Sequence, residues 1–212
     1  VTRFETRRER LREWEGEIAT IAELDSVTKD GQFVELRANL DQPEEGEQAR
    51  LHGAHGVGLF RTEFLVVGRN TMPTEEEQFE AYKKVAEAFP NKAVYIRTFD
   101  LGGDKFPMFL HMPQEENPFL GWRAIRVCLD EPELFRTQLR ALLRATAFGD
   151  MRMMLPLVNE VDEIRRTREM VQEEAAKLDK EGIEYNKGYK LGVMIETPAA
   201  ALEAAELARH AD

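Results

Sequence analysis

The chain has 212 residues, 42% of them apolar, and carries a formal net charge of −11 at pH 7. These values predict a globular domain with its own core, and they argue against a general affinity for nucleic acid or anionic membranes. No apolar run approaches the roughly 18 residues of a membrane span, and no apolar signal core follows the basic N-terminus, so we expect a cytoplasmic protein without membrane insertion.

Cysteine and histidine usage argues against disulfide-linked and zinc-binding proteins. The single cysteine, Cys128, forbids an intrachain disulfide and lies among apolar side chains on a predicted helix, so we interpret it as a core residue. The four histidines form neither a zinc-type spacing with cysteine nor a nucleophile–base pattern. In such an acidic chain, arginines that stand at strand ends are interpreted as placed for a specific anion.

The N-terminal part of the chain is predicted to be one helix followed by a turn. Apolar side chains recur at intervals of three and four over residues 2–24, which is typical of an amphipathic helix. One helix cannot bury Trp14 alone, so we expect it to lie on this domain, on a missing neighbour or on a second copy of the chain. Asp30-Gly31 marks the turn, and the boundary is placed between a linker, residues 1–32, and the main domain, residues 33–212.

Strands and helices alternate through the main domain. The first strand is expected at residues 33–40, and a short surface helix leads from it to the apolar run at residues 57–60. Thr74 and Glu77 have the spacing of a capping box and begin the next helix. A third strand follows at residues 93–97.

A long segment without helical or strand period, residues 99–117, leaves the third strand. We interpret it as a functional loop, because loops of this length are usually functional or disordered and this one leaves the strand end that carries Arg97. Asn117-Pro118 is typical of a helix start. The alternation then continues with a helix capped by Asp130 and Glu133 that ends at Gly149, a strand at 151–158, a helix at 161–178, a strand at 191–195 and a last helix after Pro198.

Five successive β/α units allow two fold classes. Right-handed crossovers give either an open doubly wound sheet or most of a (β/α)8 barrel of the TIM type. Charged residues after several successive strands favour the barrel, because a doubly wound sheet gathers its ligands at one switch point. A Gly-x-Gly-x-x-Gly turn is also missing. We therefore predict an α/β fold with about five of the eight units of a TIM-type barrel.

Charged side chains follow three of the predicted strands, namely Arg61, Arg97 and Glu196. If the strands are parallel neighbours, these side chains converge on one mouth, where guanidinium groups suit phosphate or carboxylate and a carboxylate suits a hard cation. We therefore expect a site for a phosphorylated acid and a divalent metal. Two plainer interpretations stay open: Arg61 pairs with Glu63 at the surface, and Glu196 is a structural ion-pair partner of one of the arginines.

Five sequence blocks occur in the order GVGLFRTEFL, MPTEEEQFEAY, RTFDLGGDK, ENPFLGWRAIR and GVMIETPAA. In this order they resemble the phosphoenolpyruvate–protein phosphotransferases, the enzyme I family of the bacterial phosphotransferase system. The resemblance covers residues 33–212, and the helix at 2–24 resembles the linker that precedes the family's barrel domain. Pyruvate phosphate dikinases and phosphoenolpyruvate synthases share the GLxRTE pattern and form the alternative, but the other blocks are closer to enzyme I.

The resemblance implies a phosphoenolpyruvate-binding (β/α)8 barrel with roles for four residues. Arg61 and Arg97 match substrate-binding arginines of the family, Arg123 matches an arginine near the substrate, and Glu196 matches one of two Mg²⁺ ligands. The sequence around Arg123 alone also fits a solvated helix residue. In the family the phosphoryl group passes to a histidine of a separate N-terminal domain and then to the histidine phosphocarrier protein, in sugar uptake. A homodimer is expected.

Other parts of the family's machinery are expected outside these residues. The second metal carboxylate with its asparagine, a further substrate arginine and the cysteine proton donor lie beyond Asp212, and no histidine stands in the active-histidine motif. We therefore expect no catalytic residue in this chain and no activity from it alone. The alternative is a non-catalytic module that senses phosphoenolpyruvate or forms a dimer. Unpaired rims of the first and fifth strands predict self-association and marginal stability.

Overall fold

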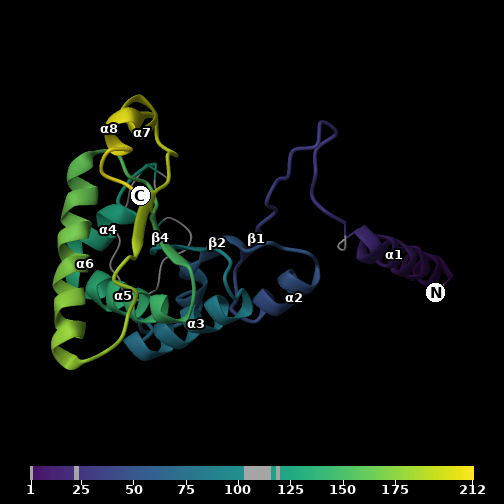
Figure 1. Cartoon of the computed structure of the whole chain (residues 1–212), viewed down its shortest axis with the longest axis horizontal. Coiled ribbons are helices and arrows are strands. Elements are labelled where there is room, and N and C mark those ends of the chain that lie inside the picture. Colours follow the sequence, from purple (N-terminus) through teal and green to yellow (C-terminus); the bar gives the residue numbers. More distant parts are fainter. Residues whose placement is uncertain (1, 22–23, 103–115, 118–119) are drawn as a thin grey trace.

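The computed structural model describes residues 2–21, 24–102, 116–117 and 120–212, and its centre is a parallel β-sheet (Figure 1). Each strand pairs in parallel with the next one in sequence. The order has no reversal among the described strands, so they form no switch point of a doubly wound sheet. The strands are β1 (Ala38–Leu40), β2 (Val57–Arg61), β3 (Val94–Arg97), β4 (Met151–Leu155) and β5 (Lys190–Val193).

The first strand is much shorter than predicted. It was expected over residues 33–40 but begins at Ala38. Phe33 instead forms an isolated antiparallel bridge with Val27, so the chain before β1 folds back on itself rather than extending the sheet. The Leu36 N–H group donates to His55 Nδ1 at 2.9 Å, which fixes the point where this fold-back reaches the sheet.

The fourth and fifth strands also differ from their predicted bounds. β4 ends at Leu155 rather than at residue 158, because Leu157 has a positive φ of 55°, which lies outside the β region. β5 ends at Val193 rather than at Ile195, because its backbone pairing with β4 stops there. The last bond between the two strands runs from the Met194 N–H to the carbonyl oxygen of Leu155, the final residue of β4, at 2.9 Å.

Helices cover one face of the sheet. The helices α3 (Glu75–Ala88), α5 (Pro132–Ala145) and α6 (Val161–Glu181) lie along it, with α5 between the other two and the short α2 (Glu45–Leu51) beside α3 (Figure 1). Burial of apolar surface, at about 25 cal/mol per Å², holds these two layers together. Alternate strand residues form the sheet's side of this core, and all are at most 3% exposed: Val94, Ile96, Met151, Met153 and Leu191.

The capping box predicted at the start of α3 is confirmed. Thr74 Oγ1 accepts the Glu77 N–H at 3.2 Å, and the Glu77 carboxylate accepts the Thr74 N–H at 2.8 Å. The Thr74 backbone bond, the Arg69 guanidinium and the Thr74 hydroxyl together lower the pKa of Glu77 to about 2. The box fixes where the chain turns from the β2 side of the sheet into α3.

The opposite face of the sheet is polar where β3 and β4 meet. Tyr95 and Arg152 are register partners there, and the Arg152 guanidinium donates to the Tyr95 hydroxyl at 2.7 Å. The guanidinium carbons of Arg37 and Arg152 lie 5.0 and 5.2 Å from the centre of the Tyr95 ring. Burial acts to raise the pKa of the Tyr95 phenol, but the two guanidinium groups outweigh it and lower the pKa below its ordinary value. A face of this kind does not suit the second apolar helix layer of a doubly wound sheet.

The helix predicted to start at Asn117 is not found in the described residues. The described part of this region becomes helical only at Ile125, where α4 (Ile125–Asp130) begins. Ala124 has a φ of 52° and donates its N–H to the Leu101 carbonyl oxygen at 2.9 Å, so the backbone turns sharply just before the helix. Most of the long segment predicted to be a functional loop, residues 103–115, lies outside the described residues.

The predicted capping of α5 is wrong. Its N-cap residue is Glu131, which makes no side-chain cap bond, and the proline that follows suits a first helical turn. The Asp130 carboxylate instead accepts the indole N–H of Trp122 at 2.6 Å. The helix ends at Ala145 and continues as a short 3-10 helix, η2 (Thr146–Phe148), before Gly149.

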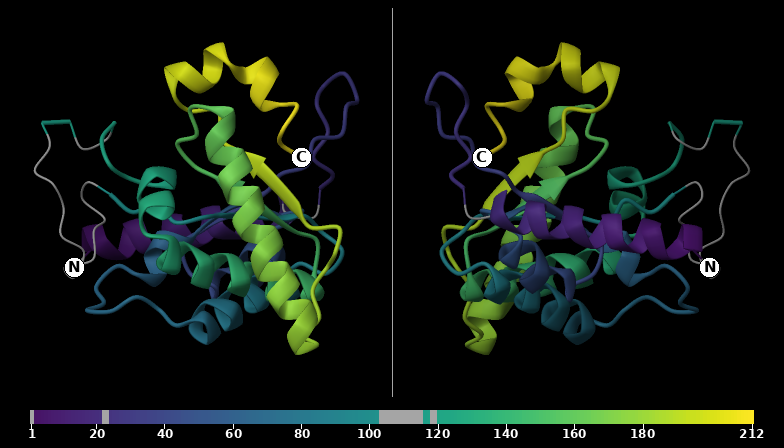
Figure 2. Two further views of the ribbon diagram at one scale, coloured as in Figure 1. Left: turned by 90° about the vertical axis from the view of Figure 1, so that its left-hand side faces the viewer. Right: turned by 90° about the vertical axis from the view of Figure 1, so that its right-hand side faces the viewer.

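Helices at both ends of the chain complete the structure. α1 (Thr2–Ile21) confirms the predicted N-terminal helix, but its side chains Phe4, Leu11 and Trp14 are exposed. α7 (Pro198–Leu202) and α8 (Ala204–Leu207) lie beyond the carboxyl end of β5, as Figures 1 and 2 show from different sides. Within the described parts of the chain, no helix has both the length and the apolar character needed to cross a membrane.

The substitution Gly56→Ala is expected to destabilise the fold by about 1–3 kcal/mol. A β-carbon at position 56 would lie 2.5 Å from the Ala93 carbonyl oxygen, which cannot easily retreat because it accepts the Val57 N–H at 3.0 Å. Urea denaturation followed by circular dichroism measures the loss. Gly188→Ala is the matched control, because its β-carbon would meet only Asn186 Oδ1, at 3.4 Å. Equal stability of the two variants would contradict the close approach of β2 to β3.

The thiol of Cys128 is expected to resist thiol reagents while the chain is folded. The side chain is 1% exposed, and burial raises the pKa of the thiol well above its ordinary value, so the reactive thiolate is scarce. Ellman's reagent should label the 212-residue chain only after guanidinium chloride is added. Rapid stoichiometric labelling in native buffer would show that Cys128 is not the core residue described here.

Candidate functional site

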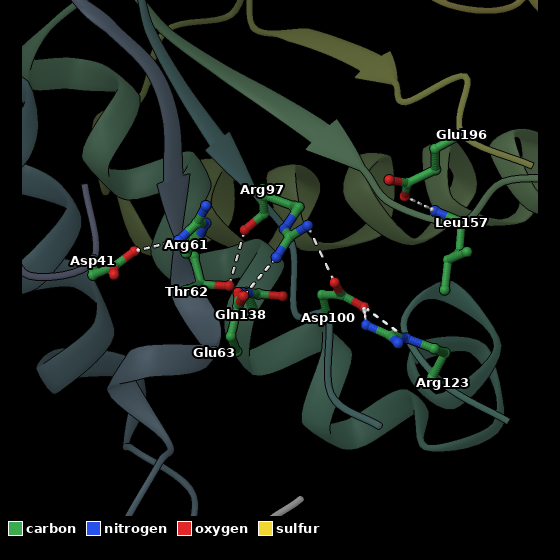
Figure 3. A network of polar contacts seen from close by, with 10 residues as sticks. All are labelled: Asp41, Arg61, Thr62, Glu63, Arg97, Asp100, Arg123, Gln138, Leu157 and Glu196. Atoms are coloured by element: carbon green, nitrogen blue, oxygen red, sulfur yellow. Dashed lines mark hydrogen bonds and ion pairs between the residues drawn. The ribbon is translucent and has the colours of Figure 1, made fainter. Parts of the chain in front are cut away.

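The carboxyl ends of the strands bring the predicted site residues to one edge of the sheet (Figure 3). Arg61 is the last residue of β2 and Arg97 is the last of β3, and the two are register partners in the parallel ladder. Glu196 follows β5 at the same edge, because all the described strands are parallel. The carboxyl ends of such strands are where α/β enzymes build their sites.

Arg97 is held between two buried carboxylates. Its guanidinium group contacts Glu63 Oε1 at 2.5 Å and Asp100 Oδ2 at 3.1 Å. The side chains of Arg97, Glu63 and Asp100 are only 9%, 0% and 8% exposed. Glu63 comes from the 3-10 helix η1 (Thr62–Leu65), which directly follows β2. The Arg97 Nε–H group has no hydrogen-bond partner among the described residues, so one donor of this buried cation is left over.

Asp100 also holds Arg123, so it joins two of the predicted arginines (Figure 3). Asp100 Oδ1 accepts from Arg123 Nε at 3.1 Å and from Arg123 Nη2 at 2.8 Å. Arg123 does not lie inside a helix as predicted, but in the turn that precedes α4. The backbone approaches it closely: a β-carbon on Gly102 would lie 2.1 Å from the Arg123 β-carbon, and Gly102 has a φ of 154°. Only glycine fits this position.

Arg61 pairs with a different carboxylate from the one considered in the sequence. It contacts Asp41 Oδ1 at 3.1 Å, and both side chains are about a third exposed, at 36% and 37%. The interpretation that Arg61 pairs with Glu63 is therefore wrong, because Glu63 turns beneath the edge toward Arg97. Arg61 is the most exposed of the three arginines at this edge.

Glu196 does not lie in an ion pair with the arginines among the described residues. Its Oε1 atom accepts the Leu157 N–H at 2.7 Å, a bond that ties the end of β5 to the residues after β4. The residue is exposed to solvent. No group of three or more His, Cys, Asp or Glu side chains that could hold a metal occurs in the described part of the chain. Mg²⁺ commonly uses one or two protein carboxylates with phosphate oxygens and water, so a single exposed carboxylate at this edge fits it.

The sequence reasoning missed four residues of this site: Asp41, Thr62, Asp100 and Gln138. Thr62 directly follows Arg61, and Asp100 lies three residues after Arg97, so both stand within the sequence blocks that carry the arginines. Gln138 is a polar residue on the apolar face of α5, three residues after the buried Phe135 and four before the buried Leu142. A polar side chain at a core position signals a buried hydrogen-bond partner.

Comparison with known proteins places the chain in a family. The family described as PEP-utilising enzyme, PEP-binding domain, where PEP is phosphoenolpyruvate, matches residues 15–212. A Staphylococcus carnosus protein named phosphoenolpyruvate-protein phosphotransferase is 47% identical over the whole chain. Proteins of the same name from Listeria monocytogenes and Geobacillus stearothermophilus are 50% and 44% identical over 88% and 100% of the chain. The chain spans only 33–37% of the length of these relatives. The family match, which covers nearly all of the chain, shows that this protein belongs to the PEP-binding domains of PEP-utilising enzymes.

Proposed function

We propose that this chain binds phosphoenolpyruvate at the strand-end edge, as part of an enzyme that transfers the phosphoryl group to a protein. The observation that carries the proposal is the register pairing of Arg61 with Arg97 at the ends of adjacent parallel strands. Guanidinium groups present rigid forks of donors that match both the phosphate and the carboxylate of the ligand. The shared name of the relatives supports the reaction class.

The three arginines have different roles in this proposal because their burial differs. Arg61 is the one that a ligand reaches most directly, and its partner Asp41 is equally exposed. Arg97 and Arg123 are 9% and 12% exposed, and both already give donors to Asp100. A ligand phosphate that contacts them takes over part of the role of Asp100. The contacts with Glu63 and Asp100 hold the two guanidinium groups in place before a ligand arrives.

Glu196 is the proposed protein ligand for Mg²⁺. The leaving phosphoryl group carries concentrated negative charge, and a Mg²⁺ ion held by Glu196 would neutralise that charge. The bond from Leu157 N–H occupies Glu196 Oε1 and holds the carboxylate at the mouth of β5. The arginines orient the phosphate in the same region of the edge, so the chain's own contribution is placement and electrostatic stabilisation.

The proposed architecture of the main domain, residues 33–212, is part of a (β/α)8 barrel. Sequential parallel pairing of the strands supports it, as does the helix layer on a single face. The polar face that carries Tyr95 and Arg152 would then be the inside of the barrel. We propose further that the acceptor is a histidine outside this chain, that the histidine phosphocarrier protein receives the phosphoryl group next, and that the working form is a cytoplasmic homodimer serving sugar uptake.

The substitution Arg61→Ala is expected to weaken phosphoenolpyruvate binding by at least about tenfold, because a charge-assisted, bidentate contact is lost. Isothermal titration of the full-length gene product in the presence of Mg²⁺ measures the change. Arg61 is suited to this test because its ion pair with Asp41 is partly exposed, so its loss should leave the fold intact.

The matched control for this experiment is Arg209→Ala. Arg209 also pairs with a carboxylate, that of Glu206, but its side chain is 72% exposed and this ion pair includes none of the proposed ligand-binding residues. Its loss should leave the affinity unchanged. If both variants bind phosphoenolpyruvate as tightly as the unmodified protein, the strand-end edge is not the binding site.

Removal of Mg²⁺ should weaken phosphoenolpyruvate binding in the unmodified protein, and Glu196→Gln should abolish most of that dependence. The amide keeps an oxygen that can accept the Leu157 N–H, so the local backbone bond survives while the charge that attracts the metal is lost. Titrations with and without EDTA measure the dependence. Glu203→Gln, an exposed carboxylate seven residues further on, is the control. An unchanged Mg²⁺ dependence in Glu196→Gln would exclude this residue as a ligand.

A further inference from the structure

A buried network of hydrogen bonds runs beneath the strand-end edge, and Gln138 on α5 is its centre. The side chains of Gln138, Thr62 and Tyr82 are fully buried. Gln138 Nε2 donates to Thr62 Oγ1 and to Tyr82 Oη, both at 3.2 Å, and Gln138 Oε1 accepts the Phe99 N–H at 3.0 Å. The Tyr82 hydroxyl, which accepts from Gln138, in turn donates to Gln78 Oε1 at 3.1 Å, so both of its hydrogen-bonding roles are filled.

The network fixes the backbone on both sides of Thr98, the residue that follows Arg97. Thr62 Oγ1 accepts from Gln138 and donates to the Arg97 carbonyl oxygen at 2.9 Å (Figure 3). Gln138 takes the Phe99 N–H directly. The intervening Thr98 N–H donates to the Met154 carbonyl oxygen on β4, at 2.9 Å. The backbone of residues 97–99, at the end of β3, is therefore held by hydrogen bonds to the segment after β2, to β4 and to α5.

This turn of backbone sets the geometry of the arginine site. It carries Arg97 at its start and Asp100 just after Phe99, and Asp100 is the carboxylate that holds both Arg97 and Arg123. Thr62, at the other end of the bond from Gln138, lies between Arg61 and Glu63 in the chain. The Gln138 amide therefore bonds to the two segments that carry Glu63 and Asp100, the carboxylates that hold Arg97 and Arg123.

We propose that Gln138 is a positioning residue for the anion site: it contacts neither ligand nor arginine side chain, but holds the ends of β2 and β3 in the spacing that phosphoenolpyruvate requires. The inference rests on the proposed function, because it takes phosphoenolpyruvate as the ligand. Gln suits the role because one amide supplies an acceptor for Phe99 and donors for Thr62 and Tyr82 together. An aliphatic residue of similar size would fill the space but leave a buried N–H group without a partner.

The first test is Gln138→Met in the full-length gene product. The thioether keeps the volume but offers no N–H donor and only a weak acceptor, so the strand ends lose their tie to α5. We expect affinity for phosphoenolpyruvate, measured by isothermal titration, to fall by about tenfold or more, since small displacements of positioning groups have effects of this size. Thermal unfolding of each variant shows that it is folded at the temperature of the titration.

The second variant, Tyr82→Phe, separates positioning from a general loss of stability. It removes the hydroxyl at the far arm of the network but leaves the bonds of Gln138 to Thr62 and Phe99. We expect a lowered melting temperature with phosphoenolpyruvate affinity within about twofold of the unmodified protein, because the strand-end bonds survive. If Tyr82→Phe and Gln138→Met weaken binding equally, affinity follows stability and the positioning role is overturned.

The third variant, Gln138→Glu, gives a readout that a purely structural role does not. Burial raises the pKa of a carboxyl group, and the neutral acid retains an oxygen for the Phe99 N–H and an O–H donor for Thr62. The ionised form has no donor. We therefore expect the affinity ratio of this variant to the unmodified protein to be near one at low pH and to fall as pH rises through the variant's pKa. A ratio that does not change with pH would overturn the proposal, even if Gln138→Met fails to fold.

The outcomes for the two proposals are distinct. If the unmodified protein does not bind phosphoenolpyruvate, the proposed function fails and this inference fails with it. If the unmodified protein binds and Arg61→Ala does not, but a folded Gln138→Met binds normally, the binding site stands and only the positioning role of Gln138 is wrong.

Discussion

The buried charge of Arg97 is the constraint on which the rest of this edge depends. A guanidinium group only 9% exposed is stable only if carboxylates and hydrogen bonds replace the water that it has lost. Glu63 must therefore turn under the end of β2, and the chain after β3 must bring Asp100 back toward its own strand. Removing one partner of such a pair typically costs about 3–5 kcal/mol, because the other charge stays buried. The contacts that stabilise the local fold are thus the same ones that position the arginines of the site.

The layered sheet explains why this arrangement is possible. Among the described elements, α3, α5 and α6 pack together on one face, so the helix layer supports the strand ends from that side. The opposite face carries a tyrosine between two guanidinium groups instead of an apolar layer. One face of the parallel sheet is therefore buried by apolar packing against helices, while the other carries polar and charged side chains.

Strong local signals in the sequence predicted the regular elements and the strand-end arginines, but not the pairing among charges. The capping box of Thr74 and Glu77 and the periodicity of α6 are set by neighbours in the chain, so they could be recognised there. The partner of Glu63 depends on which way the chain turns after β2, and that turn is decided by contacts with β3 and α5. A contact that is distant in sequence also explains why the predicted helix begins only at Ile125: Ala124 has a positive φ, and its N–H bonds to the Leu101 carbonyl oxygen.

The close approach of Gly102 to Arg123 has a consequence for how the charge of Arg123 is placed. The bond from Ala124 N–H to the Leu101 carbonyl oxygen lies beside it, so residues 101–102 and 123–124 form one clasp at the site. A β-carbon at position 102 would meet the Arg123 β-carbon and push the two sides of this clasp apart. The guanidinium group would then move away from Asp100 although neither charge had been altered. A residue with no side chain thus controls the distance within an ion pair to which it contributes no charge.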